Sequence, residues 1–267
     1  MGISAEQVAL FDAQGYLHLR NHLPPPLVEA MRSAGEHAIE RALADPVPDQ
    51  VCLLETAAGR FVGRINPLHR WAAPVSLALA GSGELRAIGE AFCGPDFLAV
   101  YESLAPKVPR DEQVHGWHQD LVHARRGRVI TVGVYLNPTS AEEGALRLIP
   151  GSHRTRREAG SLPRDFDVAE AVVVSAQAGD VVVHDAMIVH GSDVTRRQPQ
   201  RMICYFEYRP LTHLRADPRF ASEWIEARLR LAALERSVAA GAHRADADAI
   251  IEAAHAWREP HEPAHYV

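Results

Sequence analysis

Lysine and cysteine are both scarce in this chain of 267 residues. A single lysine, Lys107, stands against 27 arginines, a ratio that an arginine-favouring codon usage explains. The three cysteines, Cys52, Cys93 and Cys204, form no C-x-x-C pair. Their spacing excludes a disulfide framework and a cysteine-rich zinc site, and it favours reduced thiols in a cytoplasm.

Long apolar runs and an excess of positive charge are also missing. No run approaches the roughly 18 residues of a membrane span, and the first residues lack the basic and apolar regions of a signal peptide. The formal net charge of −6 offers no basic surface for nucleic acid or for a membrane. We therefore expect a cytoplasmic monomer or homodimer that has neither nucleic-acid nor membrane partners. Phosphate-loop, zincin and nucleophile-elbow motifs are absent.

Helical signals gather at the two ends of the chain. Ser4 and Gln7 satisfy a capping-box pattern for a helix over residues 4–13, and Gly15 ends it. Apolar residues at helical spacing predict further helices over 27–44, 78–93 and 222–239. A short alternating stretch over residues 15–20 reads as a strand.

The middle of the chain has the character of a β protein. Short β-branched or aromatic runs bounded by turn signals occupy residues 97–104, 128–136, 145–149, 171–175, 180–184 and 201–208. This spacing predicts a mainly β fold with flanking α-helices, specifically a double-stranded β-helix (a cupin-like jelly roll). We expect one domain over residues 1–267, with the jelly-roll core at about 97–210 and helical flanks at 1–96 and 211–267.

A candidate metal site begins at His118 and Asp120. In an extended segment residues i and i+2 point to the same face, so this imidazole and this carboxylate project together. They supply two ligands of a 2-His-1-carboxylate iron(II) site, which keeps its other positions open for reactants. His190, at the end of an apolar segment, is the candidate third ligand. Taken alone, an H-x-D pattern also occurs by chance in solvated turns.

Two residues near His190 suggest a cosubstrate. Arg201 lies 11 positions beyond His190, and its planar guanidinium can hold a carboxylate with two hydrogen bonds. Ser192 can add a further hydrogen bond. A dicarboxylic cosubstrate that chelates iron through a 2-oxo acid end would place its far carboxylate within reach of Arg201.

These motifs resemble those of the phytanoyl-CoA dioxygenase family of 2-oxoglutarate-dependent oxygenases. The resemblance covers most of the chain and is carried by residues 11–19, the metal motif at 117–120, the segment Glu-Gly-Ala-Leu-Arg-Leu-Ile-Pro-Gly-Ser-His at 143–153, the His-Gly-Ser at 190–192, and Arg201. It implies that His118, Asp120 and His190 bind Fe(II) and are the catalytic centre. It also implies that Arg201 and Ser192 bind 2-oxoglutarate and that O2 is the second cosubstrate.

The resemblance also bears on the reaction. Related halogenases replace the metal-binding aspartate with a small residue, so the intact Asp120 argues against halogenation. We expect hydroxylation of a small molecule in specialised metabolism, with release of succinate and CO2. Epimerisation, desaturation or ring closure by the same cofactors remains an alternative, as does a jelly-roll protein that binds metal without redox turnover.

Secondary candidates surround the predicted centre. Thr131 lies on the same strand face as Gly133 and Tyr135, and we expect it to touch the cosubstrate. Family members often carry an aromatic residue where Gly133 stands, and Tyr135 is expected to fill the space and contact the substrate.

The remaining substrate candidates are Tyr101 and Ser103, which share a strand face, and Arg64, which can bind an anionic substrate or, like Arg60, remain solvated. Lys107 either buttresses the site or lies on the surface. Rival metal ligands are His115, His123, His153 and His184; of these, we expect His153 to order the Pro-Gly-Ser-His loop.

Overall fold

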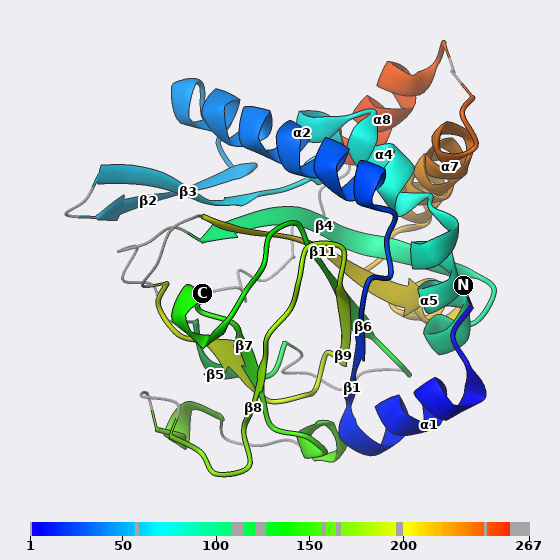
Figure 1. The fold of residues 1–267 in the computed structure, drawn as a ribbon. Helices are drawn as coiled ribbons and strands as arrows, with labels where there is room; N and C mark the ends of the chain where they lie inside the picture. The colour runs from blue at the N-terminus through cyan, green and yellow to red at the C-terminus, as the bar shows by residue number, and fades with distance from the viewer. Residues whose placement is uncertain are drawn as a thin grey trace.

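The fold is a jelly roll of two antiparallel sheets (Figure 1). The computed structural model describes residues 2–56, 59–107, 115–120, 127–155, 159–163, 167–195, 200–242 and 245–256. A seven-stranded sheet has the order β1-β9-β6-β11-β4-β3-β2, and a four-stranded sheet has the order β5-β10-β7-β8. The strands are β1 (Tyr16–Leu19), β2 (Val51–Thr56), β3 (Gly59–Ile65), β4 (Phe97–Lys107), β5 (His115–His118), β6 (Ile130–Tyr135), β7 (Leu146–Leu148), β8 (Val172–Val174), β9 (Val181–Asp185), β10 (His190–Ser192) and β11 (Arg201–Pro210). This mainly β architecture with flanking helices confirms the predicted fold class.

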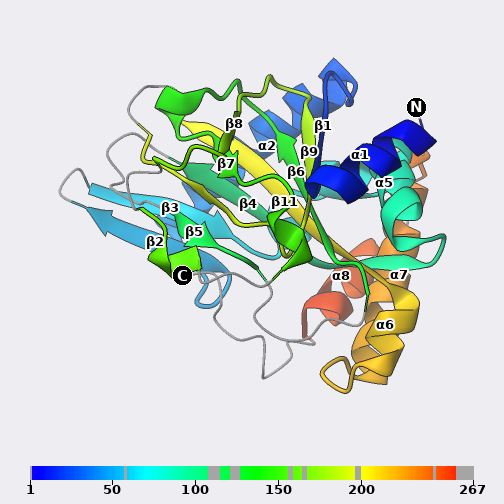
Figure 2. The same cartoon turned by 90° about the horizontal axis from the view of Figure 1, so that it is seen from below.

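Helices cover the outer face of the seven-stranded sheet, with α2 lying across it and α7 and α8 beside it (Figures 1 and 2). They are α1 (Ala5–Gln14), α2 (Pro25–Ala44), α3 (Leu68–Ala72), α4 (Val75–Ala80), α5 (Gly83–Cys93), α6 (Leu211–Ala216), α7 (Ser222–Ala239) and α8 (Ala247–Ala256). Short 3-10 turns occupy Ala141–Glu143, Ser152–Arg154 and Ala159–Ser161. None of the helices in the described ranges is long and apolar enough to cross a bilayer.

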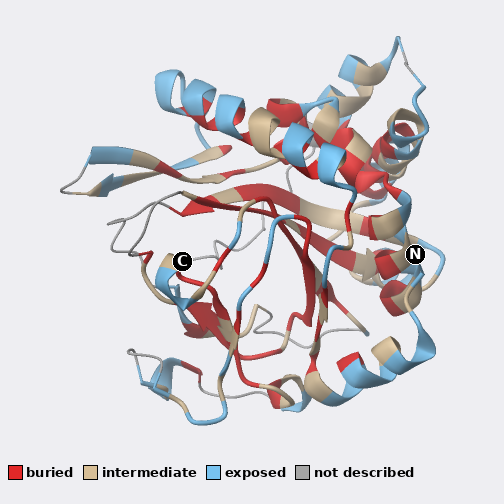
Figure 3. Cartoon of the chain, in the orientation of Figure 1, coloured by how far each residue is buried: buried red, intermediate tan, exposed pale blue. Residues whose placement is uncertain are grey.

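The centre of the seven-stranded sheet is mostly buried, as the red of β11 and of much of β4 in Figure 3 shows, whereas β2 and β3 at its edge are more exposed. Between the sheet and the helices, Leu104 and Met202 pack against Gly35 of α2, where an added Cβ would come within 3.3 Å of Leu104. Between the two sheets, Ile203 from the large sheet meets Leu148 from the small one. Because side chains alternate along a strand, every second residue of β11 faces the helices and the others face the interior, and β4 follows the same alternation from Tyr101 to Lys107, beyond the bulge in its pairing with β11.

Several predicted elements are confirmed. Helix α1 has the expected capping box at Ser4, and Gly15 ends the helix at φ 82°. Helix α7 spans the predicted residues 222–239. The single helix predicted over 78–93 is instead two helices, because Gly81 closes α4 and the Ser82 hydroxyl caps α5.

The hairpin β2–β3 was not expected in a flank predicted to be helical. Its pairing runs from Val51 opposite Ile65 to Thr56 opposite Gly59. A bulge interrupts the ladder at Gly63, whose missing side chain leaves room for Leu54, 2.9 Å from where a Cβ would stand. The hairpin reaches out from the body of the molecule (Figure 1).

The helix-facing side of β4 carries a buried ionic network. Arg228 of α7 donates to Glu102 Oε1 at 2.8 Å and to the Ala99 carbonyl at 2.6 Å. The Nδ1 atom of His69 lies 2.8 Å from the same Glu102 oxygen, in a geometry that falls short of a directed hydrogen bond. Burial raises the pKa of the Glu102 carboxyl, but the charges of His69 and Arg228 outweigh it and lower that pKa to about 2. The charges on this face are thus balanced within the protein.

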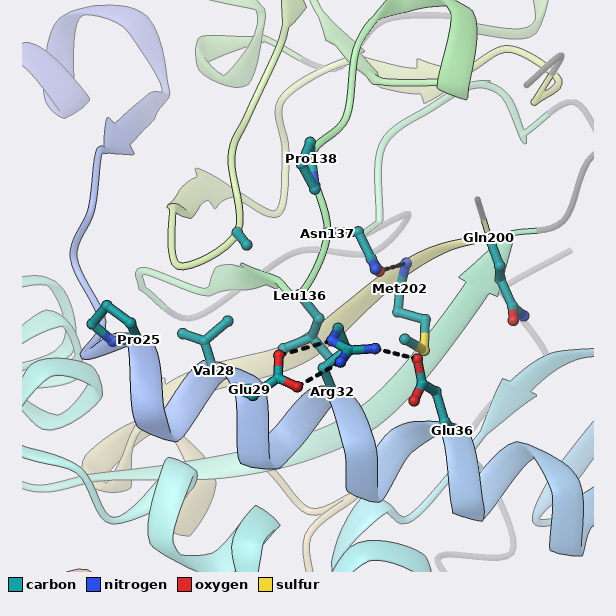
Figure 4. A pocket seen from close by; sticks show the side chains of 11 residues that line it. Pro25, Val28, Glu29, Arg32, Glu36, Leu136, Asn137, Pro138, Gln200 and Met202 are labelled. Atoms are coloured by element: carbon teal, nitrogen blue, oxygen red, sulfur yellow. Dashed lines mark hydrogen bonds and ion pairs between the residues drawn. The ribbon is translucent and has the colours of Figure 1, made fainter. Parts of the chain in front are cut away.

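A cavity of about 570 Å³ opens between α2 and the segments around Leu136 and Met202 (Figure 4). Its charged groups satisfy one another: Arg32 donates to Glu29 at 2.5 and 3.0 Å and to Glu36 at 2.5 Å. The cavity's described charged side chains therefore pair with one another, and one arginine against two glutamates leaves a net negative charge that does not favour an anionic ligand.

Candidate metal centre

The pairing of β5 with β10 brings the two candidate histidine ligands together. His118 ends β5, His190 begins β10, and the two residues are opposite each other in the register. Asp120 lies two residues beyond β5, where its backbone N–H donates to the Ala186 carbonyl at 2.9 Å. Asp120 and His190 are 70 positions apart in the sequence, and the pairing of β5 with β10, together with the turn after β5, brings them close to each other.

The three side chains converge on one point. Asp120 Oδ1 lies 3.5 Å from the Nε2 atoms of both His118 and His190, and the three candidate ligand atoms all lie within 4.8 Å of one another. The Nδ1 atoms are occupied elsewhere: that of His118 lies 2.8 Å from the Gly116 carbonyl and that of His190 lies 3.0 Å from the Ile188 carbonyl. Each carbonyl accepts from an Nδ1–H, which leaves the Nε2 lone pairs for a metal. The donor set fits ferrous iron.

The electrostatics favour the protonation states that a metal requires. Burial raises the pKa of the Asp120 carboxyl, but the imidazoles of His190, His118 and His184 outweigh it and hold that pKa far below its usual range. Burial, aided by the neighbouring His118, lowers the pKa of His190 to about 3. At neutral pH the carboxylate is therefore charged and His190 is neutral, as metal ligands must be.

Two further residues support the candidate ligands. The Thr131 hydroxyl donates to Asp120 Oδ2 at 3.2 Å. Thr131 was predicted to contact the cosubstrate; its contact in the structure is with a candidate ligand, which it orients. The ring of His184 packs 4.7 Å from that of His190, and its Nδ1 lies 3.3 Å from the Asp185 carbonyl.

A second cluster lies where β4 and β11 meet. Arg201 and Lys107 are opposite each other in the register, and they are only 5% and 2% exposed. The Lys107 ammonium donates to Ser192 Oγ at 3.0 Å and to the Asp193 carbonyl at 2.5 Å. Arg201 donates through Nη1 to the Gly144 carbonyl, and its Nε has no hydrogen-bond partner in the described part of the chain. Lys107 is thus buried beside the site, and the surface alternative for it is wrong.

The segment at 143–153 supports both clusters. Gly144 adopts φ 66°, and a Cβ there would come within 2.5 Å of the Asp193 carbonyl, so only glycine fits the turn that presents its carbonyl to Arg201. Ser152 accepts from the N–H of Val189 at 2.8 Å and thereby fixes the residue before His190. Neither role was evident in the sequence, although both residues lie in a motif that it singled out.

The space opposite Gly133 is filled by a residue that the sequence did not indicate. A Cβ at Gly133 would lie 3.1 Å from the ring of Tyr205 on the neighbouring strand. Tyr135, which was expected there, is 1% exposed and packs with Ile203 and Leu148 between the sheets. The ring of Tyr205, on the neighbouring strand β11, therefore occupies the space at Gly133, and the pairing of Tyr205 with Gly133 can be known only from the register of the two strands.

The other candidates separate into two groups. Tyr101 and Ser103 face the interior, because the side chains of Glu102 and Leu104 reach the helices. Arg60 is exposed and pairs with Glu55 at 2.5 Å, as a solvated surface residue would.

Of the rival metal ligands, His115 and His184 are outside the triad formed by the described residues. His153 packs against Gly15 at the end of α1, where a Cβ would come within 2.3 Å of its Nδ1. His123 lies outside the described residues.

A jelly roll that presents two imidazoles and one carboxylate on one face defines a class of proteins, the non-haem iron oxygenases. The family model described as phytanoyl-CoA dioxygenase (PhyH) matches residues 11–202, and the chain belongs to this family. It is a non-haem iron dioxygenase whose cofactors are Fe(II) and 2-oxoglutarate, with O2 as cosubstrate.

Individual relatives are distant. The chain is 24% identical over 221 residues to an ectoine dioxygenase from Sphingopyxis alaskensis, covering 72% of this chain and 71% of the relative. The crystal structure of EctD from S. alaskensis with bound Fe has a TM-score of 0.68 at 23% identity, covering 79% and 78% of the two chains. A non-heme alpha ketoglutarate dependent carbocyclase, SnoK from nogalamycin biosynthesis, has a TM-score of 0.64 at 20% identity, covering 78% and 84%. At these identities the solved structures establish the fold.

Proposed function

We propose that this enzyme hydroxylates a small organic molecule, with iron held by His118, Asp120 and His190 and 2-oxoglutarate held by Arg201, Lys107 and Ser192. The observation that carries the proposal is Arg201, a guanidinium that is only 5% exposed and whose Nε has no hydrogen-bond partner among the described residues. A buried charge is costly unless an opposite charge compensates it. The far carboxylate of 2-oxoglutarate supplies that charge.

The hydrogen bonds around Arg201 and Lys107 leave suitable donors for this carboxylate. Ser192 Oγ accepts from Lys107, so its own hydroxyl hydrogen remains for a carboxylate oxygen. Arg201 is oriented through the Gly144 carbonyl, and its Nε–H has no partner among the described residues. Charge-assisted hydrogen bonds of this kind are about twice as strong as neutral ones.

Within the site, the protein binds and orients. Iron with bound 2-oxoglutarate and O2 supplies the oxidation of a substrate C–H bond, together with formation of succinate and CO2. Thr131 fixes Asp120, backbone carbonyls fix the rings of His118 and His190, and the register of β4 with β11 brings Lys107 opposite Arg201. Such positioning is the protein's main contribution to cofactor chemistry.

Arg201→Ala tests the anchor. We expect the 2-oxoglutarate concentration for half-maximal succinate formation to rise about 100-fold, because a buried charge-assisted contact of roughly 2–3 kcal/mol is lost. Arg20→Ala, at an exposed position, is the matched control and should leave it unchanged. An unchanged requirement in Arg201→Ala would refute the anchor, and a wild-type protein that forms no succinate would refute the function.

Ring closure is the second candidate outcome, supported by the shared fold with a carbocyclase. Epimerisation and desaturation would use the same residues. Turnover under ¹⁸O2 separates these outcomes, because only hydroxylation places one labelled oxygen in the product. A metal-binding protein without redox turnover would release no succinate at all.

A further inference from the structure

A second cavity, of about 250 Å³, lies among the helices beside the seven-stranded sheet. Helices α4, α5 and α7, the beginning of α6, the start of β4 and the end of β11 surround it. Most of its wall is apolar and is formed by Phe97, Leu98, Leu211, Leu229 and Ala232. The described residues that line it include no candidate residue of the metal centre, so the two sites are separate.

One buried carboxyl lines this cavity. Glu235 of α7 is 7% exposed, and no hydrogen bond or ion pair joins its carboxyl to another residue in the described ranges. Arg228 lies seven positions earlier on the same face of the helix. Its guanidinium donates instead to Glu102 and to the Ala99 carbonyl. Glu235 is therefore the exception to the balance of charge on this side of the sheet.

Electrostatic interactions place this carboxyl near a second polar group of the cavity. Burial, together with the charge of Glu102, raises the pKa of Glu235 above its usual range. The charges of Arg228 and Arg236 offset only part of this rise. Burial also raises the pKa of Tyr208, which lines the same cavity, and the charge of Glu235 raises it further. Without a positive partner, the Glu235 carboxyl thus keeps its proton at neutral pH.

The exposed rim of the cavity is electrically neutral. Arg86 donates to Glu90 at 2.7 Å. Arg236 and Asp96, both exposed, add one charge of each sign. Among the described lining residues, Glu235 is thus the one charged group that is buried. An apolar wall with one buried acid suits a ligand that has an apolar body and a single positive charge.

We propose that this cavity binds a small primary amine with a short apolar body, whose ammonium group is held by the carboxylate of Glu235. The ammonium provides the positive charge that the described residues do not place beside this carboxylate, and its N–H groups donate to the carboxylate oxygens. The carbon body covers Phe97 and Leu229 and removes their apolar surface from water. Binding releases the proton of the Glu235 carboxyl to the solvent as the ion pair forms. The site lies outside the proposed oxygenase function and does not depend on it.

The test uses the protein loaded with Fe(II) and 2-oxoglutarate without oxygen, at pH 7. The probes are isobutylamine and isobutanol, which has the same shape but no charge. Isothermal titration calorimetry measures both affinities, and its repetition in buffers of different ionisation enthalpy gives the number of protons released. We expect isobutylamine to bind at least about tenfold more tightly than isobutanol and to release close to one proton. Equal binding of the two probes, or binding of the amine without proton release, would overturn the proposal.

Three variants locate the site. Glu235→Gln keeps the shape of the side chain, and we expect it to abolish both the preference for the amine and the proton release. Glu226→Gln, exposed on the same helix, is the matched control and should retain both. Ala232→Leu fills the cavity while the carboxyl stays in place, so it should weaken the binding of both probes. A preference that survives in Glu235→Gln, or unchanged binding in Ala232→Leu, would place the amine elsewhere and refute the site.

The visible band of Fe(II) with 2-oxoglutarate shows whether the amine binds at the metal instead. We expect this band to stay unchanged throughout the titration, because the cavity does not include the metal ligands. A band that shifts over the same concentration range would place the amine on the iron and overturn the proposal. If the band is absent before any amine is added, the proposed function fails, and the calorimetry still decides whether the cavity binds the amine.

Discussion

The two faces of the seven-stranded sheet differ in whether their buried charged groups are compensated by other groups of the protein. On the helix-facing side, Glu102 meets Arg228 and His69, and each charge finds its opposite. On the interior side, the buried Arg201 lies opposite Lys107, and the Nε of Arg201 has no hydrogen-bond partner among the described residues. Both groups lie on β4 and its packing partners. Charged groups are buried on both faces, so burial alone does not show which of them serve the fold and which bind a ligand. The distinguishing property is whether an opposite charge of the protein compensates the buried group.

The cavity beneath α2 supports the same lesson. It has a volume of about 570 Å³, but each of its charged side chains already has a partner, since Arg32 pairs with both Glu29 and Glu36 (Figure 4). The interior face concentrates three imidazoles around one carboxylate and places two cations at the end of β4 and β11. We therefore expect ligands to bind where a buried charged group, such as Arg201, has atoms without a partner among the described residues.

The largest expected effect is at the metal. Asp120→Ala removes the one carboxylate of the candidate triad, and we expect iron binding and succinate formation to fall below detection. The apo-protein should still fold, with a modestly lower Tm, because the variant loses the interactions of this carboxylate with the neighbouring imidazoles and with Thr131. Metal content and thermal unfolding of the apo-protein check both points. A large fall in Tm with iron retained would reverse the roles assigned to the two faces.

The opposite result is expected on the helix-facing side. Arg228→Met leaves Glu102 buried without its main partner, which costs about 3–5 kcal/mol of unfolding free energy. Urea unfolding measures this loss, with Arg230→Met, exposed on the same helix, as the control. In the folded variant the affinity for 2-oxoglutarate should be unchanged. A weaker affinity without a loss of stability would show that the two faces are coupled.

The sequence could predict what is local. The capping box at Ser4 and the spacing of α7 depend on neighbours within a few positions, and both elements appear as expected. The residues nominated as metal ligands also come together, although no strand was predicted at His118 and Asp120, whose i, i+2 spacing was the local signal. The fold class followed from the spacing of short strands.

What depends on register could not be predicted. Tyr205 fills the space at Gly133 because β6 and β11 are aligned as they are, and a shift of two residues would bring another side chain there. Lys107 had a signal, as the one lysine in the chain, but its contact with Ser192 needs two strands to meet. The β2–β3 hairpin lacks a tight-turn signature, so its strands escaped notice.

The smallest effect concerns a carboxyl on the helix-facing side that lacks the compensation of its neighbours. Burial, with the nearby charge of Glu102, raises the pKa of Glu235 on α7 to about 8 from an unfolded value of 4.5. Between these two values the folded chain binds more protons than the unfolded chain, so its stability falls as pH rises. The contribution is fully present below about pH 4.5 and is lost above about pH 8. Glu235→Gln should remove this slope, matching the wild type near pH 5 and exceeding its stability by an increasing margin as the pH approaches 8. Urea unfolding at pH 5, 6, 7 and 8 measures the difference, and Glu226→Gln, exposed on the same helix, should follow the wild type throughout. Parallel curves for Glu235→Gln and the wild type would mean that this carboxyl is compensated after all, which would make the helix-facing side balanced without exception.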